Sequence, residues 1–253
     1  MSAFSERSEP TNSQAFSRLQ KETQVAGFFV SVEGVDGSGK SGMARRLGDW
    51  LHEKSIAVVS TREPGGSAGA ERIRELLLGS GGILDPLAEA LLFAAARADH
   101  VRKLIVPTLE AGGVVVSDRF SDSTIAYQGA GSTVDMAVIQ QLQQIAVGEH
   151  RPDLVIVLDV DPAISMERAR KRNGDAGVKD DRFEVEGLAF HARVREGFLR
   201  QAATDRSRYV VIDASRTPDE VWGDVRRAVR DALLKNGMEL TNSLSLAPLP
   251  SPR

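Results

Sequence analysis

The sequence of 253 residues contains no cysteine, and this absence excludes disulfide bonds, thiolate metal sites and cysteine nucleophiles. The four histidines are scattered and lack the spacing that is typical of metal ligands. No apolar run approaches the roughly 18 residues that a membrane-spanning helix needs, so we expect no membrane partner. The net charge of −3 gives no sign of a nucleic-acid-binding surface, so we expect no nucleic-acid partner either.

The two ends of the chain differ in composition from its middle. Residues 1–26 are rich in Ser, Glu, Gln and Thr and contain few large apolar side chains, so we expect a loose N-terminal extension. Residues 237–253 end in a proline-rich segment and are expected to form a second tail. The N-terminal segment carries acidic residues and no long apolar stretch, which argues against a signal peptide. We therefore expect a cytoplasmic protein with one folded domain over residues 27–236.

Predicted strands and helices alternate between these tails. Short apolar runs predict strands at 28–32, 56–61, 113–117, 154–159 and 209–213. Most of these runs are continuous, as in strands buried on both faces of a parallel sheet. Helical patterns lie at 40–54, 68–78, 86–110, 133–147, 162–172, 184–203 and 218–235. The pattern predicts a three-layer α/β domain with about five parallel strands, in which ligands bind beyond the carboxyl ends of the strands.

A glycine-rich loop follows the first predicted strand. Residues 34–41 read Gly-Val-Asp-Gly-Ser-Gly-Lys-Ser and match the pattern G-x-x-x-x-G-K-[ST]. The glycines allow backbone N–H groups to approach phosphate oxygens at the N-terminus of the next helix. Lys40 can reach the outer phosphates, and the hydroxyl group of Ser41 can bind a magnesium ion. The sequence therefore predicts a P-loop that binds a nucleoside triphosphate.

Three more segments at strand ends or on a nearby helix carry groups suited to a nucleotide. Asp118 and Arg119 follow a buried strand and offer a carboxylate for magnesium and a guanidinium for phosphate. Arg62 precedes a Pro-Gly-Gly turn and can donate two hydrogen bonds to a phosphate. Phe93 and Arg97 share one helical face, where they could stack on a base and donate to its carbonyl oxygen. A core Phe beside a snorkelling Arg is the alternative for this pair.

Taken together, these segments resemble bacterial thymidylate kinases. The resemblance rests on residues 33–41, 61–66, 92–97, 117–119, 123–129 and 181–184, and their order and spacing match over about residues 27 to 235. It implies a P-loop NTPase fold with a small lid over about residues 171–184. It also implies transfer of the γ-phosphoryl group of ATP to dTMP, a requirement for Mg²⁺, and a homodimer.

The resemblance also implies roles for individual residues. ATP would bind to Gly34, Val35, Asp36, Gly37, Ser38, Gly39, Lys40, Ser41 and Arg168, and the metal to Ser41 and Asp118. dTMP would bind to Asp36, Arg62, Phe93, Arg97, Arg119, Ser123, Tyr127 and Gln128. The catalytic cations would be Lys40, Arg62, Arg119, Arg170 and Arg172. The last two lie at the start of the lid, and the lid would supply the arginine that this P-loop lacks.

Two features depart from the family pattern. Gly42 stands where a second hydroxyl residue is usual, and the insert over residues 173–179 is longer than expected. Other functions stay open: another nucleoside monophosphate kinase, a deoxynucleoside kinase with Glu63 as base, a GTP-binding switch, or a degenerate relative that only binds. Three arginines facing the acceptor favour a charged monophosphate, and the absence of an Asn-Lys-x-Asp motif disfavours the GTP switch.

Overall fold

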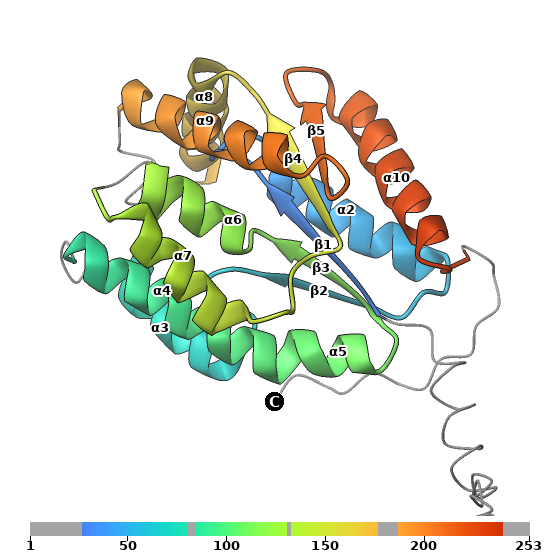
Figure 1. The fold of residues 1–253 in the computed structure, drawn as a ribbon. Coiled ribbons are helices and arrows are strands. Elements are labelled where there is room, and N and C mark those ends of the chain that lie inside the picture. Colours follow the sequence, from blue (N-terminus) through green and yellow to red (C-terminus); the bar gives the residue numbers. More distant parts are fainter. Residues whose placement is uncertain (1–26, 80–83, 131–132, 177–186, 240–253) are drawn as a thin grey trace, which may run out of the picture.

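Five parallel strands form one sheet through the middle of the folded molecule (Figure 1). A computed structural model describes residues 27–79, 84–130, 133–176 and 187–239. The strands are β1 (Phe28–Glu33), β2 (Val58–Arg62), β3 (Val114–Asp118), β4 (Leu154–Asp159) and β5 (Tyr209–Asp213). They lie in the order β2-β3-β1-β4-β5, and every pair is parallel. The predicted α/β fold with about five parallel strands is confirmed.

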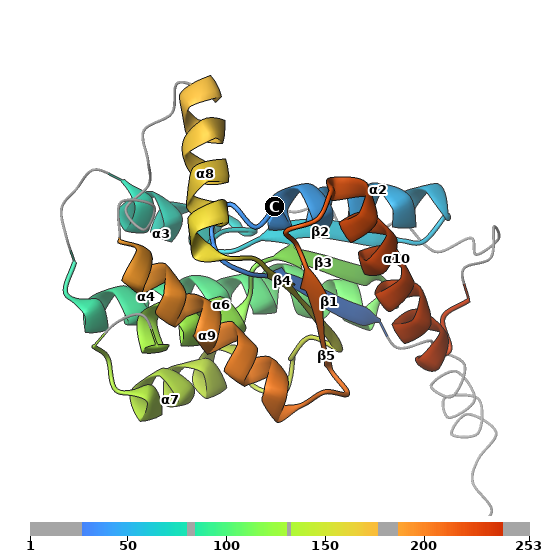
Figure 2. The ribbon, with the colours of Figure 1, turned by 90° about the horizontal axis from the view of Figure 1, so that it is seen from above.

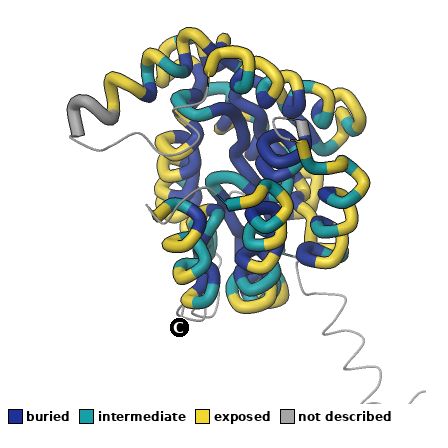
Figure 3. The backbone as a smooth tube through the Cα atoms, turned by 90° about the vertical axis from the view of Figure 1, so that its left-hand side faces the viewer, coloured by how far each residue is buried: buried dark blue, intermediate teal, exposed yellow. Residues whose placement is uncertain are grey.

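Burial explains why the three middle strands read as continuous apolar runs. β1, β3 and β4 are almost entirely buried, whereas the edge strands β2 and β5 are only partly covered. Alternate residues of β1 join different cores, because Val30 packs with one apolar cluster and Phe29 with another. Figure 3 shows the buried strands at the centre and exposed residues on the outer sides of the helices.

Helices cover both faces of the sheet and complete three layers (Figure 1). One face carries α2 (Lys40–Glu53) and α10 (Pro218–Lys235), which meet through an edge-to-face contact between Trp50 and Trp222. The other face carries α4 (Pro86–His100), α5 (Val106–Glu110), α6 (Ser121–Thr124), α7 (Met136–Val147) and α9 (Leu188–Thr204), and α3 (Ala68–Leu78) packs on α4. Helix α8 (Pro162–Ala176) projects away from the sheet (Figure 2).

Two segments differ from the expected helix pattern. The helix expected over residues 86–110 contains a π-helical turn at Val101–Ile105, just before Pro107, whose missing N–H interrupts regular α-helical pairing. The chain after β3 was not expected to be helical, yet it forms α6 and a π-helical turn at Ile125–Ala130. The second of these segments lines the cavity described below, through Ser123, Thr124, Tyr127 and Gln128, whereas Val101 and Ile105 of the first belong to an apolar core cluster.

Other boundaries shift by a few residues. Helix α7 begins three residues later than expected, where the side chain of Asp135 accepts a hydrogen bond from the N–H of Ala137. Helix α8 continues to Ala176, so the first residues of the expected lid are helical, and residues 177–186 lie outside the described part. Met238 was expected in the C-terminal tail but is buried against the core. Residues 1–26 and 240–253 also lie outside the described part.

No helix in the described ranges is long and apolar enough to cross a membrane.

Candidate functional site

A cavity of about 260 Å³, called the first cavity below, opens at the carboxyl ends of β1, β2 and β3. The loops that leave these strands supply much of its lining, as expected for a parallel sheet. All eight residues predicted to bind the acceptor nucleotide line it: Asp36, Arg62, Phe93, Arg97, Arg119, Ser123, Tyr127 and Gln128. Lys40, Ser41, Asp118 and Arg172 line it as well.

The first cavity has an excess of positive charge. Among the described residues, its cationic side chains are Lys40, Arg62, Arg74, Arg97, Arg119 and Arg172, and its carboxylates are Asp36, Glu63 and Asp118. Six cations facing three anions suit a ligand with several phosphate oxygens. The excess of cationic side chains therefore favours the binding of a phosphorylated compound.

The lysine of the P-loop points into this charged site. Its ammonium group is buried and lies 3.3 Å from the carbonyl oxygen of Val35 and 3.1 Å from Oδ1 of Asp36. Burial and the neighbouring Arg119 lower the pKa of Lys40, and the charge of Asp36 opposes this shift. Bound phosphates would add negative charge beside the ammonium group and so favour its protonated form.

The P-loop packs directly against the first turn of α8. Gly37 has a φ of +80°, and a Cβ at this position would lie 1.9 Å from the carbonyl oxygen of Ser165. Glycine is the residue that tolerates both the left-handed backbone and this close approach. The position of α8 is therefore tied to the conformation of the phosphate-binding loop.

Asp36 links the P-loop to Arg119 and Tyr127. Its Oδ1 accepts a hydrogen bond from Nη2 of Arg119, and its Oδ2 accepts one from the hydroxyl group of Tyr127 at 2.7 Å. The Arg119 guanidinium lies 4.9 Å from the centroid of the Tyr127 ring. Burial alone would raise the pKa of Asp36, but Arg119 and Lys40 outweigh it and hold this pKa well below its usual range. Asp36 is therefore ionised and holds both side chains at the cavity wall.

The backbone around Arg119 adopts a conformation that is uncommon for a residue with a side chain. Its φ is +70°, a region that costs about 1–2 kcal/mol for residues other than glycine. Its N–H donates to the carbonyl oxygen of Val32 at 3.0 Å, and its own carbonyl accepts from Oγ of Ser117 at 2.6 Å. These bonds fix the turn from which Asp118 and Arg119 line the cavity.

Glu33, at the end of β1, supports Arg119 indirectly, through hydrogen bonds to its neighbour Phe120 and to Ser123. Sequence reasoning assigned Glu33 no role. Its Oε1 accepts from the N–H of Phe120 and its Oε2 from Oγ of Ser123, both at 2.7 Å. Ser123 in turn accepts from Nη1 of Arg119 at 3.2 Å. Burial, and then the nearby carboxyl group of Asp122, raise the pKa of Glu33 to about 8. An acidic residue at the end of an apolar strand was the available signal.

Phe93 and Arg97 both line the first cavity, from helix α4. Phe93 is only partly buried and belongs to neither apolar core cluster of the described residues. Arg97 is 2 % exposed, so its guanidinium does not reach out to solvent. The alternative of a core Phe beside a snorkelling Arg is therefore wrong.

The residues expected to bind a metal ion fit that role in chemistry and position. Oδ1 of Asp118 is buried and has no hydrogen-bond partner within the described residues, and Ser41 lines the same cavity. Over the same residues, no group of three or more His, Cys, Asp or Glu side chains could hold a metal. An ion such as Mg²⁺ would therefore use Ser41 and Asp118 together with phosphate oxygens and water.

A second cavity of about 350 Å³ also borders the P-loop, through residues that do not line the first cavity. Gly37, Ser38 and Gly39 line it, together with residues of α8 and of the segment after β5. Arg172 lines both cavities, whereas Arg170 is exposed and lines neither.

Arg168 also lines the second cavity, from helix α8. Its guanidinium donates to the carbonyl oxygens of Ala214 at 2.7 Å and Ser215 at 3.1 Å. Helix α8 is therefore attached to the loop that follows β5.

Sequence reasoning missed several residues of the first cavity. Arg74 on α3 lines it and donates to the carbonyl oxygen of Pro64 at 2.7 Å, yet nothing in the helical pattern distinguished it from a surface arginine. Thr124 belongs to the helix that was not expected. Glu63 was considered only as a base, but its carboxylate is bonded to Arg97 and His100. At Gly42, an added Cβ would meet nothing within 4 Å, so the missing side chain leaves open space.

Comparisons with known proteins agree with one another. The family model "Thymidylate kinase" matches residues 32–225. Thymidylate kinase of Cereibacter sphaeroides is 50 % identical over 196 residues, which cover 77 % of this chain and 90 % of that protein. Thymidylate kinase of Syntrophotalea carbinolica is 45 % identical over 214 residues, which cover 83 % of this chain and 99 % of that protein. A crystal structure of thymidylate kinase from Ehrlichia chaffeensis matches with a TM-score of 0.65 and 34 % identity, covering 81 % of this chain and 99 % of that one.

Proposed function

The chain belongs to the thymidylate kinase family, and from this premise we propose where its two substrates bind and how its residues act on them. As a dTMP kinase, it transfers the γ-phosphoryl group of ATP to dTMP, which gives dTDP and ADP. We place dTMP in the first cavity, and ATP on the P-loop with its nucleoside in the second cavity. The supporting observation is that the P-loop lines both cavities through different residues, and that Arg172 lines both as well.

Within the first cavity, the side chains divide by chemistry between the parts of dTMP. Phe93 offers a flat face for the thymine ring, and Arg97 offers a donor for a carbonyl oxygen of that ring. Tyr127 lies beside Arg119 and is well placed to crowd a ribose 2'-hydroxyl group. Arg62 and Arg119 would bind the phosphate.

Ser123 and Gln128 complete the wall next to these residues, and Arg74 adds a further cation to the same cavity.

The reaction requires no strong general base, because the acceptor oxygen of a phosphate is already a nucleophile. Catalysis then depends on alignment and on neutralising the charge of the transferring phosphoryl group, where one arginine can contribute about 10³–10⁵-fold in rate. Asp36 bonds to both Lys40 and Arg119 and so holds these two cations together at the wall of the first cavity. Glu63 is buried and hydrogen-bonded to Arg97 and His100. These bonds argue against the deoxynucleoside kinase alternative, because that reaction would need Glu63 as a base.

Mg²⁺ is the cofactor that the donor set supports. Ser41 and the unpartnered oxygen of Asp118 would hold it against the phosphates of ATP. When bound, the ion neutralises phosphate charge and helps to align the reacting groups.

Helix α8 would provide the lid contacts. Arg172 lines both cavities and is the best placed lid arginine for the phosphate groups between them. Arg168 holds the loop after β5 and so shapes the donor side. A catalytic role for Arg170 stays a prediction, as does a cytoplasmic location.

A homodimer is part of the same proposal. Large apolar side chains are exposed on three neighbouring helices: Leu76 on α3, Leu87 and Leu91 on α4, and Ile145 on α7. Exposed apolar surface of this kind is typical of a protein–protein interface. We propose that a second copy of the chain covers it.

Steady-state kinetics of two variants test the placement of the substrates. We expect Phe93→Ala to raise the KM for dTMP at least about tenfold and the KM for ATP less than about twofold, because only the first cavity contains the ring. Lys40→Ala should instead lower kcat by at least about 100-fold. Equal increases of both KM values in Phe93→Ala would show that the ring only supports the fold, and near-full turnover by Lys40→Ala would remove Lys40 from the mechanism.

A further inference from the structure

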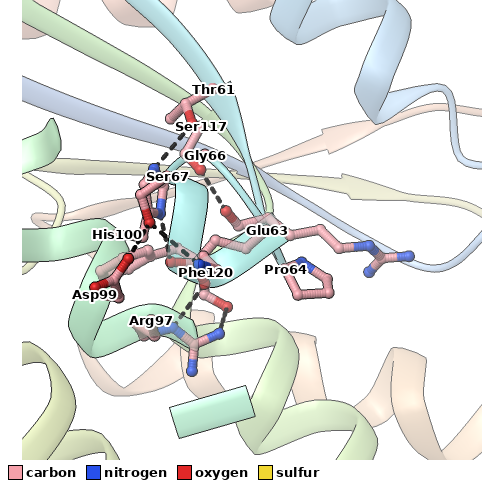
Figure 4. A network of polar contacts seen from close by, with 12 residues as sticks. Thr61, Glu63, Pro64, Gly66, Ser67, Arg97, Asp99, His100, Ser117 and Phe120 are labelled. Atoms are coloured by element: carbon pink, nitrogen blue, oxygen red, sulfur yellow. Dashed lines mark hydrogen bonds and ion pairs between the residues drawn. The ribbon is translucent and has the colours of Figure 1, made fainter. Parts of the chain in front are cut away.

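A buried polar network joins the turn after β2 to helix α4 (Figure 4). Oε2 of Glu63 accepts from Nε of Arg97 at 2.7 Å, and Oε1 lies 2.9 Å from Nδ1 of His100. Nε2 of His100 lies 2.8 Å from Oγ1 of Thr61, at the end of β2. Glu63, Arg97 and His100 are each less than 7 % exposed. The two oxygens of Glu63 therefore have separate partners, both on α4.

Counted over the described residues, the hydrogen bonds of Arg97 leave one of its N–H groups without a partner. A guanidinium has five N–H donors and no acceptor. Four of them are used, because Nε bonds to Glu63, Nη1 to both Thr124 and Gln143, and Nη2 to the carbonyl oxygen of Phe120. The remaining N–H belongs to Nη2, and the residue lines the first cavity. A ligand can therefore meet a single donor here, and never an acceptor.

The four partners of Arg97 come from separate parts of the fold. Glu63 follows β2, Phe120 follows β3, Thr124 lies in α6 and Gln143 lies in α7. A rotation of the guanidinium would break several of these bonds at once, so its orientation is fixed by the surrounding structure. Among the four, Glu63 alone is a carboxylate, and it bonds to Nε, the nitrogen nearest to the aliphatic stem.

His100 fixes Glu63 in turn. By holding Oε1, it prevents the carboxylate from turning away from Arg97. Gly66 closes the other side: an added Cβ would lie 2.4 Å from Nε2 of His100 and 2.4 Å from Oγ1 of Thr61. Burial alone would raise the pKa of Glu63, but Arg97 and His100 lower it below the usual value, so the carboxyl group is ionised at neutral pH.

We propose that Glu63, held by His100, is a positioning residue that directs the single remaining N–H of Arg97 at the nucleobase. The site thereby accepts a carbonyl group at position 4 of the pyrimidine ring and rejects an amino group there. A donor facing a donor leaves both groups without a partner, which is the usual basis of strong discrimination between such substrates. This inference rests on the proposed binding of the base beside Phe93 and Arg97.

Two substitutions at Glu63 separate geometry from charge. Glu63→Gln can keep both hydrogen bonds, because its amide oxygen can accept from Arg97 while its NH₂ group donates to Nδ1 of a His100 tautomer protonated on Nε2. Glu63→Asp keeps the charge but is one methylene shorter, so it cannot reach both partners. If position matters, the Gln variant keeps the selectivity and the Asp variant loses it.

The measurement is the ratio of kcat/KM for dTMP to kcat/KM for 5-methyl-dCMP, which has a 4-amino group in place of the 4-oxo group and lacks the N3 proton. We expect a ratio of at least about 100 for the wild type, as for sites that read a polar group. Glu63→Gln should keep this ratio within about threefold, and Glu63→Asp should lower it at least about tenfold, mainly through the KM for dTMP. The exposed Glu75→Asp on α3 is the matched control and should change nothing.

The outcomes distinguish this inference from the proposal beneath it. A wild-type enzyme that does not discriminate would overturn the placement of the base against Arg97. A wild type that discriminates, with a folded Glu63→Gln variant that does not, would overturn the positioning role and leave the placement standing. The same holds if Glu63→Asp keeps the full ratio. Thermal unfolding and ATP binding confirm that each variant is folded, and the Gln variant decides the question if the Asp variant does not fold.

Discussion

At the residue scale, the buried carboxyl group of Glu33 makes the stability of the fold depend on pH. Its pKa is raised from 4.5 to about 8, by burial and by Asp122, against the opposing effects of Ser123, Arg119 and the N–H of Phe120. A raised pKa means that the folded state binds the proton more tightly than the unfolded chain. The stability associated with this proton is therefore fully present below pH 4.5 and is lost as pH rises toward 8.

Glu33→Gln should remove this loss, because a neutral amide can accept from Phe120 and donate to Ser123. We expect its Tm, relative to the wild type, to rise between pH 5 and pH 8 by at least about 3 °C, or about 1 kcal/mol for a domain of this size. Thermal unfolding without nucleotide at several pH values measures it. A Tm difference that stays constant or shrinks as pH rises would show that Glu33 is ionised in the folded enzyme at neutral pH.

At the scale of secondary-structure elements, the contact between the P-loop and α8 sets a demand on one glycine. Gly37→Ala would place a methyl group against the backbone of Ser165, which cannot rotate away as a side chain could. Gly39 is a matched control, because its φ is +94° but an added Cβ meets nothing within 4 Å. We expect Gly37→Ala to lower the free energy of unfolding by at least about 2 kcal/mol more than Gly39→Ala does.

Denaturant unfolding of the two variants without nucleotide gives this comparison directly. Both substitutions introduce a side chain at a positive φ, so that cost is common to both and cancels in the difference. Equal destabilisation would mean that α8 moves aside at little cost, and that the P-loop and α8 are not coupled through this contact.

The central strands were predictable because strands buried on both faces have continuous apolar sequences. The strands β1, β3 and β4 are buried on both faces and were predicted to within one residue at each end. Helix α6 and the π-helical turn after it were missed, since Ser-Asp-Ser-Thr has no helical apolar period. Tertiary bonds hold this segment instead, including the one from Arg97 to Thr124. Pattern alone also cannot separate a π-helical turn from an α-helix.

The first cavity was predictable for a related reason. Its P-loop and its Asp118-Arg119 pair follow strands whose carboxyl ends meet at one edge of the sheet, so their proximity follows from the topology. The bonds from Glu63 to Arg97 and His100 could not be foreseen, because they join segments 34 and 37 residues apart through side-chain geometry. Arg74 was missed because a helical arginine has the same sequence pattern whether it faces solvent or a cavity.

At the scale of the whole molecule, four of the eight large apolar side chains that are exposed in the described part of the chain lie on three helices of one face. Helices α3, α4 and α7 are neighbours, and each presents at least one large apolar side chain that is at least 45 % exposed. Ile145 on α7 is 74 % exposed, which is costly for an isoleucine unless something covers it. The charged cavities open at the carboxyl edge of the sheet, so pairing through the outer sides of these helices would not require the substrate sites to be covered.

We expect the wild-type enzyme to be a dimer of twice the chain mass. Ile145→Asp or Leu91→Asp should convert it to a monomer. Burying an unpaired carboxylate in the interface costs more free energy than one side chain contributes to binding in an interface of ordinary size. Leu234→Asp is the matched control, because this residue is 52 % exposed on α10, on the opposite face of the sheet. Size-exclusion chromatography with light scattering over a range of concentrations measures the mass. A monomeric wild type would overturn the dimer, and a dimer that survives both substitutions but dissociates with Leu234→Asp would move the interface to α10.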